Sequence, residues 1–259
     1  MYTKQNLLND IRQFGINPKG TLLIHSSMKA IGEVEGGADT VLDAWCEYMK
    51  DGLLIFPTHT WAQINGRYSV FDVRREPACV GILPNLFRQR PGVMRSLHPT
   101  HSVAALGTDA ADYLQGEETR TTPCPRDGCW GKLYDRNASI LFLGCSLRSN
   151  TFIHGVEEWN RIPDRIDENT QHLEILDQNG HSFAVEMHRH HCSRSSDPSE
   201  HYDKLQKPFE KHGAISYGKF GDAPCILGNA VKMVDLTSCL LQKNPDLFAD
   251  DLPVPENWY

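Results

Sequence analysis

The chain has 259 residues, of which 40% are hydrophobic and 23% are charged, a composition typical of a globular protein. No apolar run is long enough to cross a bilayer, which excludes a membrane-spanning protein. The formal net charge of −7 argues against a nucleic-acid partner and favours the approach of a cationic small molecule. The N-terminal residues lack the basic and apolar regions of a secretory signal, so we expect a cytoplasmic protein without nucleic-acid or membrane partners.

Hydrophobic periodicity predicts helices and short buried strands in alternation. Apolar residues at helical spacing cover residues 4–14, and a buried strand follows at 21–25. A second helix at 38–50 and a second strand at 53–56 complete a strand–helix–strand unit of the kind that forms parallel sheets. Further along the chain, helices are predicted at 80–89, 199–212 and 228–242, and strands at 102–106 and 139–144.

The segment 172–188 is predicted to form an antiparallel hairpin. Its apolar residues alternate on both sides of Asp177-Gln-Asn-Gly180, which has the composition of a turn. The polar and charged segment from Arg161 to Asp167 is predicted as a surface loop. No repeat, low-complexity tract or flexible linker divides the chain, so we expect a single domain over residues 1–259.

Two histidines lie three residues apart in the run from Arg95 to Gly107, just before a predicted strand. Pro99 disfavours a helix at His98, so His98 and His101 are expected on an extended loop or turn, where a reacting group can face a ligand. Imidazole is the side chain best able to exchange protons near neutral pH. The alternative is that both histidines simply form hydrogen bonds within the loop.

A possible phosphate cradle follows the first predicted strand. His25, Ser26 and Ser27 come at its carboxyl end, and Gly36-Gly37 precedes a predicted helix. Hydroxyl and backbone N–H groups in such a place can bind phosphate oxygens. The glycine-rich motifs of dinucleotide and nucleoside triphosphate sites are absent from the sequence, and a Gly-Gly pair is also a common turn.

A third candidate is the pair His154 and Glu157, which follows the predicted strand 139–144. If this segment is helical, the two residues share a face, and a carboxylate that orients an imidazole is a common acid–base arrangement. We expect the pair at the same sheet edge as His98 and His101. Alternatively, His154 caps local polar groups and one of the neighbouring glutamates binds Arg161.

The eight cysteines are scattered and suit reduced, buried thiols better than a disulfide framework. Cys124, Cys129 and the segment His188–Cys192 together allow a zinc site, although the histidine-rich half does not repeat the spacing of the cysteine pair. We therefore expect no metal, and keep a zinc-dependent hydrolase or metal-binding protein as an alternative. A cysteine nucleophile stays open, whereas a serine hydrolase lacks its Gly-x-Ser-x-Gly motif.

Taken together, several segments resemble the aminoglycoside 3-N-acetyltransferase family. They occur in the family's order, and this order is more specific than any one of them. The matching segments are 23–32 with Gly36-Gly37, 55–60, 92–107, 122–124, 131–133, 141–144 with 151–157, and 228–236.

The resemblance implies a three-layer α/β/α fold, here with a mostly parallel central sheet and the predicted antiparallel hairpin. It also implies N-acetyl transfer from acetyl-CoA to an amine of an aminoglycoside-like acceptor, which would connect the chain with antibiotic resistance. The residues implied to hold CoA are His25, Ser26, Ser27, Gly36, Gly37 and Ser102. Those implied to line the acceptor site are His98, His101, His154 and Glu157. The chain has Gly128-Cys129-Trp130 where the family commonly has Gly-Ser-Pro, so the acceptor is the least defined part of this expectation.

The implied reaction needs a base, because an ammonium group cannot attack a thioester. We expect His101 or His154 to be this base, oriented by Glu157, with direct transfer and backbone N–H groups that stabilise the oxyanion. Acidic residues near the acceptor are expected to hold further ammonium groups of a cationic sugar. A same-fold acyltransferase for another amine, or a CoA-binding module without transfer, would also suit the sequence, and a homo-oligomer is possible.

Overall fold

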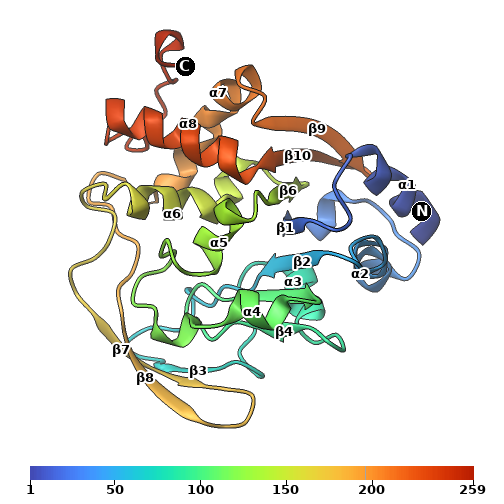
Figure 1. Cartoon of the computed structure of the whole chain (residues 1–259), viewed down its shortest axis with the longest axis horizontal. Helices are drawn as coiled ribbons and strands as arrows, with labels where there is room; N and C mark the ends of the chain where they lie inside the picture. Colours follow the sequence, from blue (N-terminus) through green and yellow to red (C-terminus); the bar gives the residue numbers. More distant parts are fainter. Residues whose placement is uncertain (196) are drawn as a thin grey trace.

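The computed structural model describes residues 1–195 and 197–259, and a seven-stranded sheet forms its centre (Figure 1). The strand order is β4-β5-β2-β1-β6-β10-β9. In chain order, the strands are β1 Thr21–Ser26, β2 Leu53–Pro57, β4 Met94–Arg95, β5 Val103–Gly107, β6 Ser139–Leu143, β9 Ile215–Phe220 and β10 Ala223–Asn229. Strands β2, β1 and β6 pair in parallel, whereas β5 and β10 run against their neighbours, so five of the seven strands share one direction. The predicted α/β class is confirmed.

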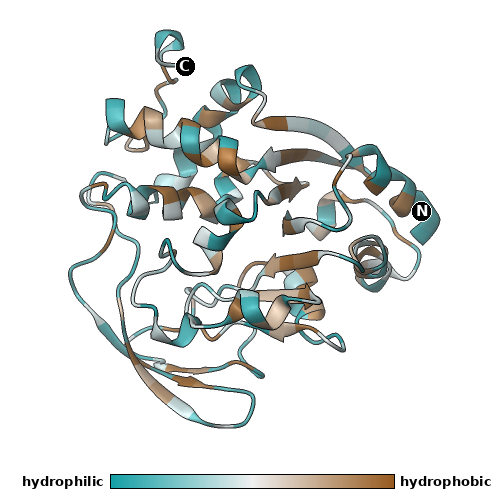
Figure 2. Cartoon of the chain, in the orientation of Figure 1, coloured by the Kyte–Doolittle hydropathy of each residue, from teal (hydrophilic) through white to brown (hydrophobic). Residues whose placement is uncertain are grey.

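Helices cover both faces of this sheet. Alternate residues of a strand point to opposite faces, and on β1 Leu22 and Ile24 belong to one buried cluster while Leu23 belongs to the other. The first cluster includes residues of α1 Lys4–Gln13, α2 Gly37–Tyr48 and α3 Ile82–Phe87. The second includes residues of α4 Ala110–Leu114, α5 Cys129–Asp135, α6 Thr151–Trp159, α7 Gln206–Lys211 and α8 Ala230–Lys243. Figure 2 shows hydrophobic residues along the central strands and hydrophilic ones on the outer helix surfaces. The three-layer architecture is therefore confirmed.

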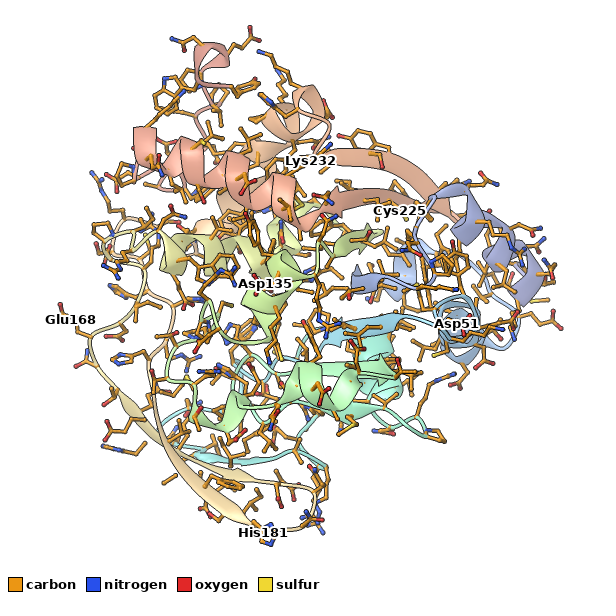
Figure 3. All side chains as sticks on the ribbon, viewed as in Figure 1. Asp51, Asp135, Glu168, His181, Cys225 and Lys232 are labelled. Carbon is orange, nitrogen blue, oxygen red and sulfur yellow. The ribbon has the colours of Figure 1, made fainter. Side chains whose placement is uncertain are left out.

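A smaller sheet projects from this body as an arm (Figure 1). It consists of β3 Val70–Asp72, β7 Gln171–Leu176 and β8 Ser182–Met187, and it has a buried cluster of its own. Strands β7 and β8 form the predicted antiparallel hairpin, and Figure 3 shows His181 at its far end. In the turn, the Asp177 carboxylate accepts hydrogen bonds from the backbone N–H groups of Asn179 and His181.

Two predicted helices differ from the structure. The segment 199–212 is split into a 3-10 helix, η4 Pro198–Leu205, and the short α7. Gly228 lies in β10, because Asn229 caps the last helix through a hydrogen bond from the Lys232 N–H, and α8 begins only at Ala230.

The antiparallel pair β9 and β10 was not predicted, since Gly218 and Gly228 interrupt its apolar pattern. The remaining 3-10 helices are η1 Met28–Ala30, η2 Glu117–Thr119, η3 Leu147–Ser149 and η5 Glu256–Trp258.

The described residues contain no helix that combines the length and the apolar character needed to span a membrane.

Candidate active site

A cavity of about 470 Å³ lies at the carboxyl ends of the central parallel strands. This is the edge at which open α/β sheets bind ligands. Strand β1 ends there with His25 and Ser26, β2 is followed by His59, and β6 is followed by η3 and α6. Chain segments that are far apart in sequence therefore meet around one space. The histidine and charged residues that line it are His25, His59, His101, Arg148, His154, Arg189, His190, His191 and Asp197.

A row of imidazole rings runs through the wall of this cavity. The ring of His101 lies 4.8 Å from that of His59 and 5.1 Å from that of His190, and His190 stacks on His154 at 4.4 Å. Burial, followed by repulsion from neighbouring histidines, lowers the pKa of His59 and of His101 well below the ordinary value. Burial and His154 also lower the pKa of His190, against the opposing effect of Glu158. The buried rings of the row are held neutral near pH 7.

His154 contacts Glu157 through a tyrosine hydroxyl, and its Nδ1 also lies 3.6 Å from Glu157 Oε2. Tyr202 Oη lies 2.7 Å from His154 Nδ1 and donates a hydrogen bond of 2.6 Å to Glu157 Oε2. Burial and the Glu157 carboxylate raise the pKa of Tyr202 well above its ordinary value, so the hydroxyl keeps its proton. That proton points to Glu157, and His154 Nδ1 must therefore be the donor to the hydroxyl oxygen. In the neutral ring, Nε2 is then unprotonated, and it lies 3.9 Å from Asp197 Oδ1 in the cavity wall.

Glu157 is almost completely buried, with 1% of its side chain exposed, and its second oxygen binds an arginine. Arg165 Nε lies 2.5 Å from Glu157 Oε1, and 3% of the arginine side chain is exposed. Burial raises the pKa of Glu157, but hydrogen bonding and charge from His154, Arg165 and Tyr202 outweigh this effect and hold the pKa below its ordinary value. The carboxylate thus stays ionised inside the protein.

The position of Arg165 corrects the expectation that 161–167 is only a surface loop. The backbone around Arg165 pairs with the segment that follows β8: His191 N–H donates to Arg165 O, and Asp167 N–H donates to Arg189 O. The two connections between the arm and the body therefore run side by side. One delivers the arginine that binds Glu157, and the other delivers the ring that stacks on His154.

His98 and His101 do lie on a loop, but only His101 reaches the cavity. His98 Nδ1 accepts a hydrogen bond of 2.9 Å from the His101 backbone N–H, and its Nε2 lies 3.0 Å from Thr122 O. Both nitrogens of this fully buried ring are thereby used to shape the loop. His101 Nδ1 in turn lies 3.0 Å from Thr100 Oγ1.

Of the residues expected to hold CoA, His25 and Ser26 line the cavity. Ser102 does not, because its hydroxyl donates to Thr58 O inside the sheet. Ser27 is also absent from the lining and its N–H donates to Leu143 O. Gly36 and Gly37, at the beginning of α2, lie outside the lining as well. Burial lowers the pKa of His25 to about 3, and its ring stacks on Phe142.

The cysteines and histidines of the zinc alternative do not gather into one site. Cys124 lies with Glu158 and His190, with ligand atoms all within 4.8 Å, whereas Cys129 Sγ donates to Tyr113 O elsewhere in the core. The atoms of the Cys124 cluster already bind one another: Glu158 Oε1 accepts from the Cys124 N–H at 2.8 Å and lies 2.7 Å from His190 Nε2. The cluster is accounted for as a hydrogen-bonded wall of the cavity.

Sequence reasoning overlooked His59, Arg165 and Tyr202. His59 had a usable signal, since Thr58-His59-Thr60 directly follows a buried strand. Arg165 and Tyr202 had none, because each lies in a segment of ordinary polar composition and becomes functional only through the packing of η4 and of the arm connection against α6.

Comparison with known proteins agrees with this geometry. The family model described as aminoglycoside 3-N-acetyltransferase matches residues 23–242. The chain belongs to this family. The predicted enzyme class, an N-acetyltransferase, and acetyl-CoA as its co-substrate are thereby confirmed.

Individual relatives cover nearly the whole chain. The SPbeta prophage-derived aminoglycoside N(3')-acetyltransferase-like protein YokD of Bacillus subtilis (strain 168) is 28% identical over 90% of either chain. Among solved structures, AAC(3)-IVa in complex with a gentamicin has a TM-score of 0.82 at 22% identity, covering 95% of this chain and 91% of that one. The AAC-IIIb binary complex with CoASH has a TM-score of 0.80 at 20% identity, covering 93% and 97%.

We expect Arg165→Met to destabilise the protein by about 3–5 kcal/mol, because it leaves the Glu157 carboxylate buried without its cationic partner. The free energy of unfolding would be measured by urea denaturation. The double variant Arg165→Met, Glu157→Gln should recover a large part of this loss, since it removes the buried charge as well. Equal losses in the single and double variants would contradict a charge-based origin.

The free energy of unfolding should fall as the pH decreases below about 6.5, the ordinary histidine pKa. His25, His59, His101 and His190 have lowered pKa values in the folded state, so the unfolded chain binds more protons and acid favours unfolding. Each contributes a slope of up to about 1.4 kcal/mol per pH unit. Urea denaturation between pH 7.5 and pH 5 would measure this, and His25→Phe should flatten the slope while exposed His172→Gln should not. A stability that does not change over this range would refute the prediction.

Proposed function

We propose that this protein transfers an acetyl group from acetyl-CoA directly to an amine, with His154 as the general base. The observation that carries the proposal is the hydrogen-bonded series His154–Tyr202–Glu157, which leaves His154 Nε2 as the free acceptor at the cavity. A group that removes a proton from an attacking amine contributes about 10²–10⁴-fold to the rate. Glu157 and Tyr202 are positioning residues in this scheme.

The acceptor nitrogen enters between His154 Nε2 and Asp197, whose carboxylate is the only one that lines the described cavity. Asp197 binds the incoming ammonium, which loses one proton to solvent to give the neutral amine, and Nε2 takes a second proton as this nitrogen attacks the thioester carbon. The C–N bond forms and the C–S bond breaks. The proton on His154 then passes to the departing thiolate of CoA, which completes the reaction without a covalent enzyme intermediate.

His154 is a better base than His101 for a physical reason. His154 Nδ1 contacts the Tyr202–Glu157 pair and its Nε2 is left toward the cavity, whereas burial and several neighbouring rings oppose a charge on His101. We assign His101 and His59 to the wall beside the thioester, and His98 to the shape of the loop. Of the expected CoA residues, the proposal retains His25 and Ser26, which line the cavity.

An amino sugar is the class of acceptor that the relatives support. Several are named as aminoglycoside acetyltransferases, and one neighbour was solved with a gentamicin and another with CoASH. The proposed transferase is a single domain over residues 1–259, because β1, β2, η3, α6, η4 and the arm connection all contribute to one cavity. This function would be tested by measuring the release of free CoA thiol from acetyl-CoA in the presence of a panel of amines. If none of the amines caused thiol release, the proposed function would be wrong.

The variant Tyr202→Phe should lower kcat by about 10–100-fold, because it preserves the buried ring but removes the hydroxyl that bridges His154 and Glu157 and leaves only their direct approach at 3.6 Å. Steady-state kinetics over a range of pH should also show a changed pH profile of kcat, because the hydroxyl that fixes the proton on Nδ1 of the base is gone. Tyr113→Phe is the matched control, because Tyr113 also has a buried hydroxyl, which donates to Cys129 O. Equal effects of the two substitutions would assign Tyr202 a merely structural role.

The variant His154→Gln should lower kcat by about 10²–10⁴-fold and leave the KM for acetyl-CoA nearly unchanged. Glutamine can still bind the Tyr202 hydroxyl, but it cannot accept the proton. Thiol-release kinetics at saturating acetyl-CoA would measure the loss, with exposed His172→Gln as the control. If kcat of the variant were within threefold of that of the unmodified enzyme, the general base would be a residue other than His154.

A further inference from the structure

The charged side chains that line the cavity are mainly cationic, although the whole chain has a net charge of −7. Arg148 and Arg189 face it from different elements, and within the described residues Asp197 is the one carboxylate in its lining. The adjacent acidic residues lie behind the wall. Glu157 is neutralised by Arg165, and Glu158 accepts from His190 and from a backbone N–H. The cavity therefore offers one site for an ammonium group and two for an anion.

Neither of these arginines has a carboxylate partner in the described part of the chain. The guanidinium of Arg189 donates a hydrogen bond of 2.6 Å to Trp61 O, and Arg148 is exposed in η3. Arginines elsewhere are commonly paired; Arg126, for example, lies 2.6 Å from Asp135. An unpaired guanidinium at a cavity is well suited to bind a phosphate, phosphonate or carboxylate in a bidentate manner.

Arg189 lines the same cavity as His154. It precedes His190, whose ring stacks on His154 at 4.4 Å. Its partner Trp61 also lines the cavity, and 44% of Trp61 is exposed, an unusual fraction for so large an aromatic residue. An exposed indole, on the residue whose carbonyl the guanidinium binds, gives the cavity a surface for the apolar face of a sugar ring in addition to a site for its anionic group.

From this arrangement we propose that the natural acceptor carries an anionic group beside its amine, and that Arg189 binds this group. The amine lies between His154 and Asp197, and the anion lies beside Trp61. This inference rests on the proposed acetyl transfer and specifies its substrate class as a zwitterionic amine, such as a phosphorylated amino sugar. A polycation would place its additional ammonium groups against Arg148 and Arg189, at an electrostatic cost.

The test compares matched acceptors that differ in one group. Glucosamine and glucosamine 6-phosphate share the ring and the amine, and gentamicin supplies the polycation; kcat/KM would be measured by thiol release from acetyl-CoA. We expect glucosamine 6-phosphate to exceed glucosamine by tenfold or more, and both to exceed gentamicin. Arg189→Gln should abolish the preference for the phosphate by lowering kcat/KM for glucosamine 6-phosphate at least tenfold, to the value for glucosamine. The control Arg67→Gln removes the same charge from an exposed site and should preserve the preference.

The phosphates of CoA are a second source of anionic groups for Arg189. The KM for acetyl-CoA and the acceptor preference distinguish binding of CoA from binding of the acceptor. If Arg189→Gln raises the KM for acetyl-CoA while the acceptor preference persists, Arg189 serves the donor and the inference is wrong. It is equally wrong if gentamicin is the better acceptor, and in that case the transferase function stands. Absence of thiol release with every amine would instead overturn the proposed function.

Binding provides a measurement that does not depend on turnover. Isothermal titration of the protein loaded with free CoA, which has no acetyl group to transfer, should give at least tenfold tighter binding of glucosamine 6-phosphate than of glucosamine. The difference should decrease as salt is added, because an exposed guanidinium is screened. Equal binding of the two sugars to the CoA complex would refute the role of Arg189.

Discussion

The candidate site depends on an ionised carboxylate that is kept inside the protein. Glu157 has almost no contact with solvent, and its two oxygens bind Arg165 on one side and the Tyr202 hydroxyl on the other. Taking a carboxylate out of water is costly, and the cost is offset only when charge and hydrogen bonds surround it. Here the same contacts that offset this cost also determine which nitrogen of His154 carries its proton. Stability and chemistry are therefore linked through one side chain.

The fold explains how these groups come together. Three parallel strands end at one edge of the sheet: His25 lies at the end of β1, His59 follows β2, and the helix that carries His154 follows β6. The rings pack in contact with each other and away from water, so most of them are poor bases. His190 also contacts a carboxylate, Glu158, but it uses its Nε2 for that contact, whereas His154 contacts Tyr202 through Nδ1 and keeps Nε2 toward the cavity. A row of similar side chains thus contains one residue that is prepared to accept a proton.

The sequence predicted the central part of this arrangement well, for identifiable reasons. Strands such as 21–25 and 139–144 are uniformly apolar because both faces are covered by helices, and that pattern is readable without a structure. The proximity of His101, His154 and Glu157 follows from the rule that parallel strands end at a common edge. Arg165 and Tyr202 could not be found in this way, since their roles arise from contacts between distant segments. The β9–β10 pair was missed because glycines replace apolar residues within it.

The arm has a buried cluster separate from the two clusters that enclose the central sheet. Its paired connections provide Arg189 and His190 to the cavity, whereas His25 and Ser26 come from the central sheet. Substitutions in the arm can therefore alter one wall of the cavity without disturbing the packing of the sheet. One wall of the cavity is thus free to diverge during evolution while the wall that the central sheet supplies is preserved.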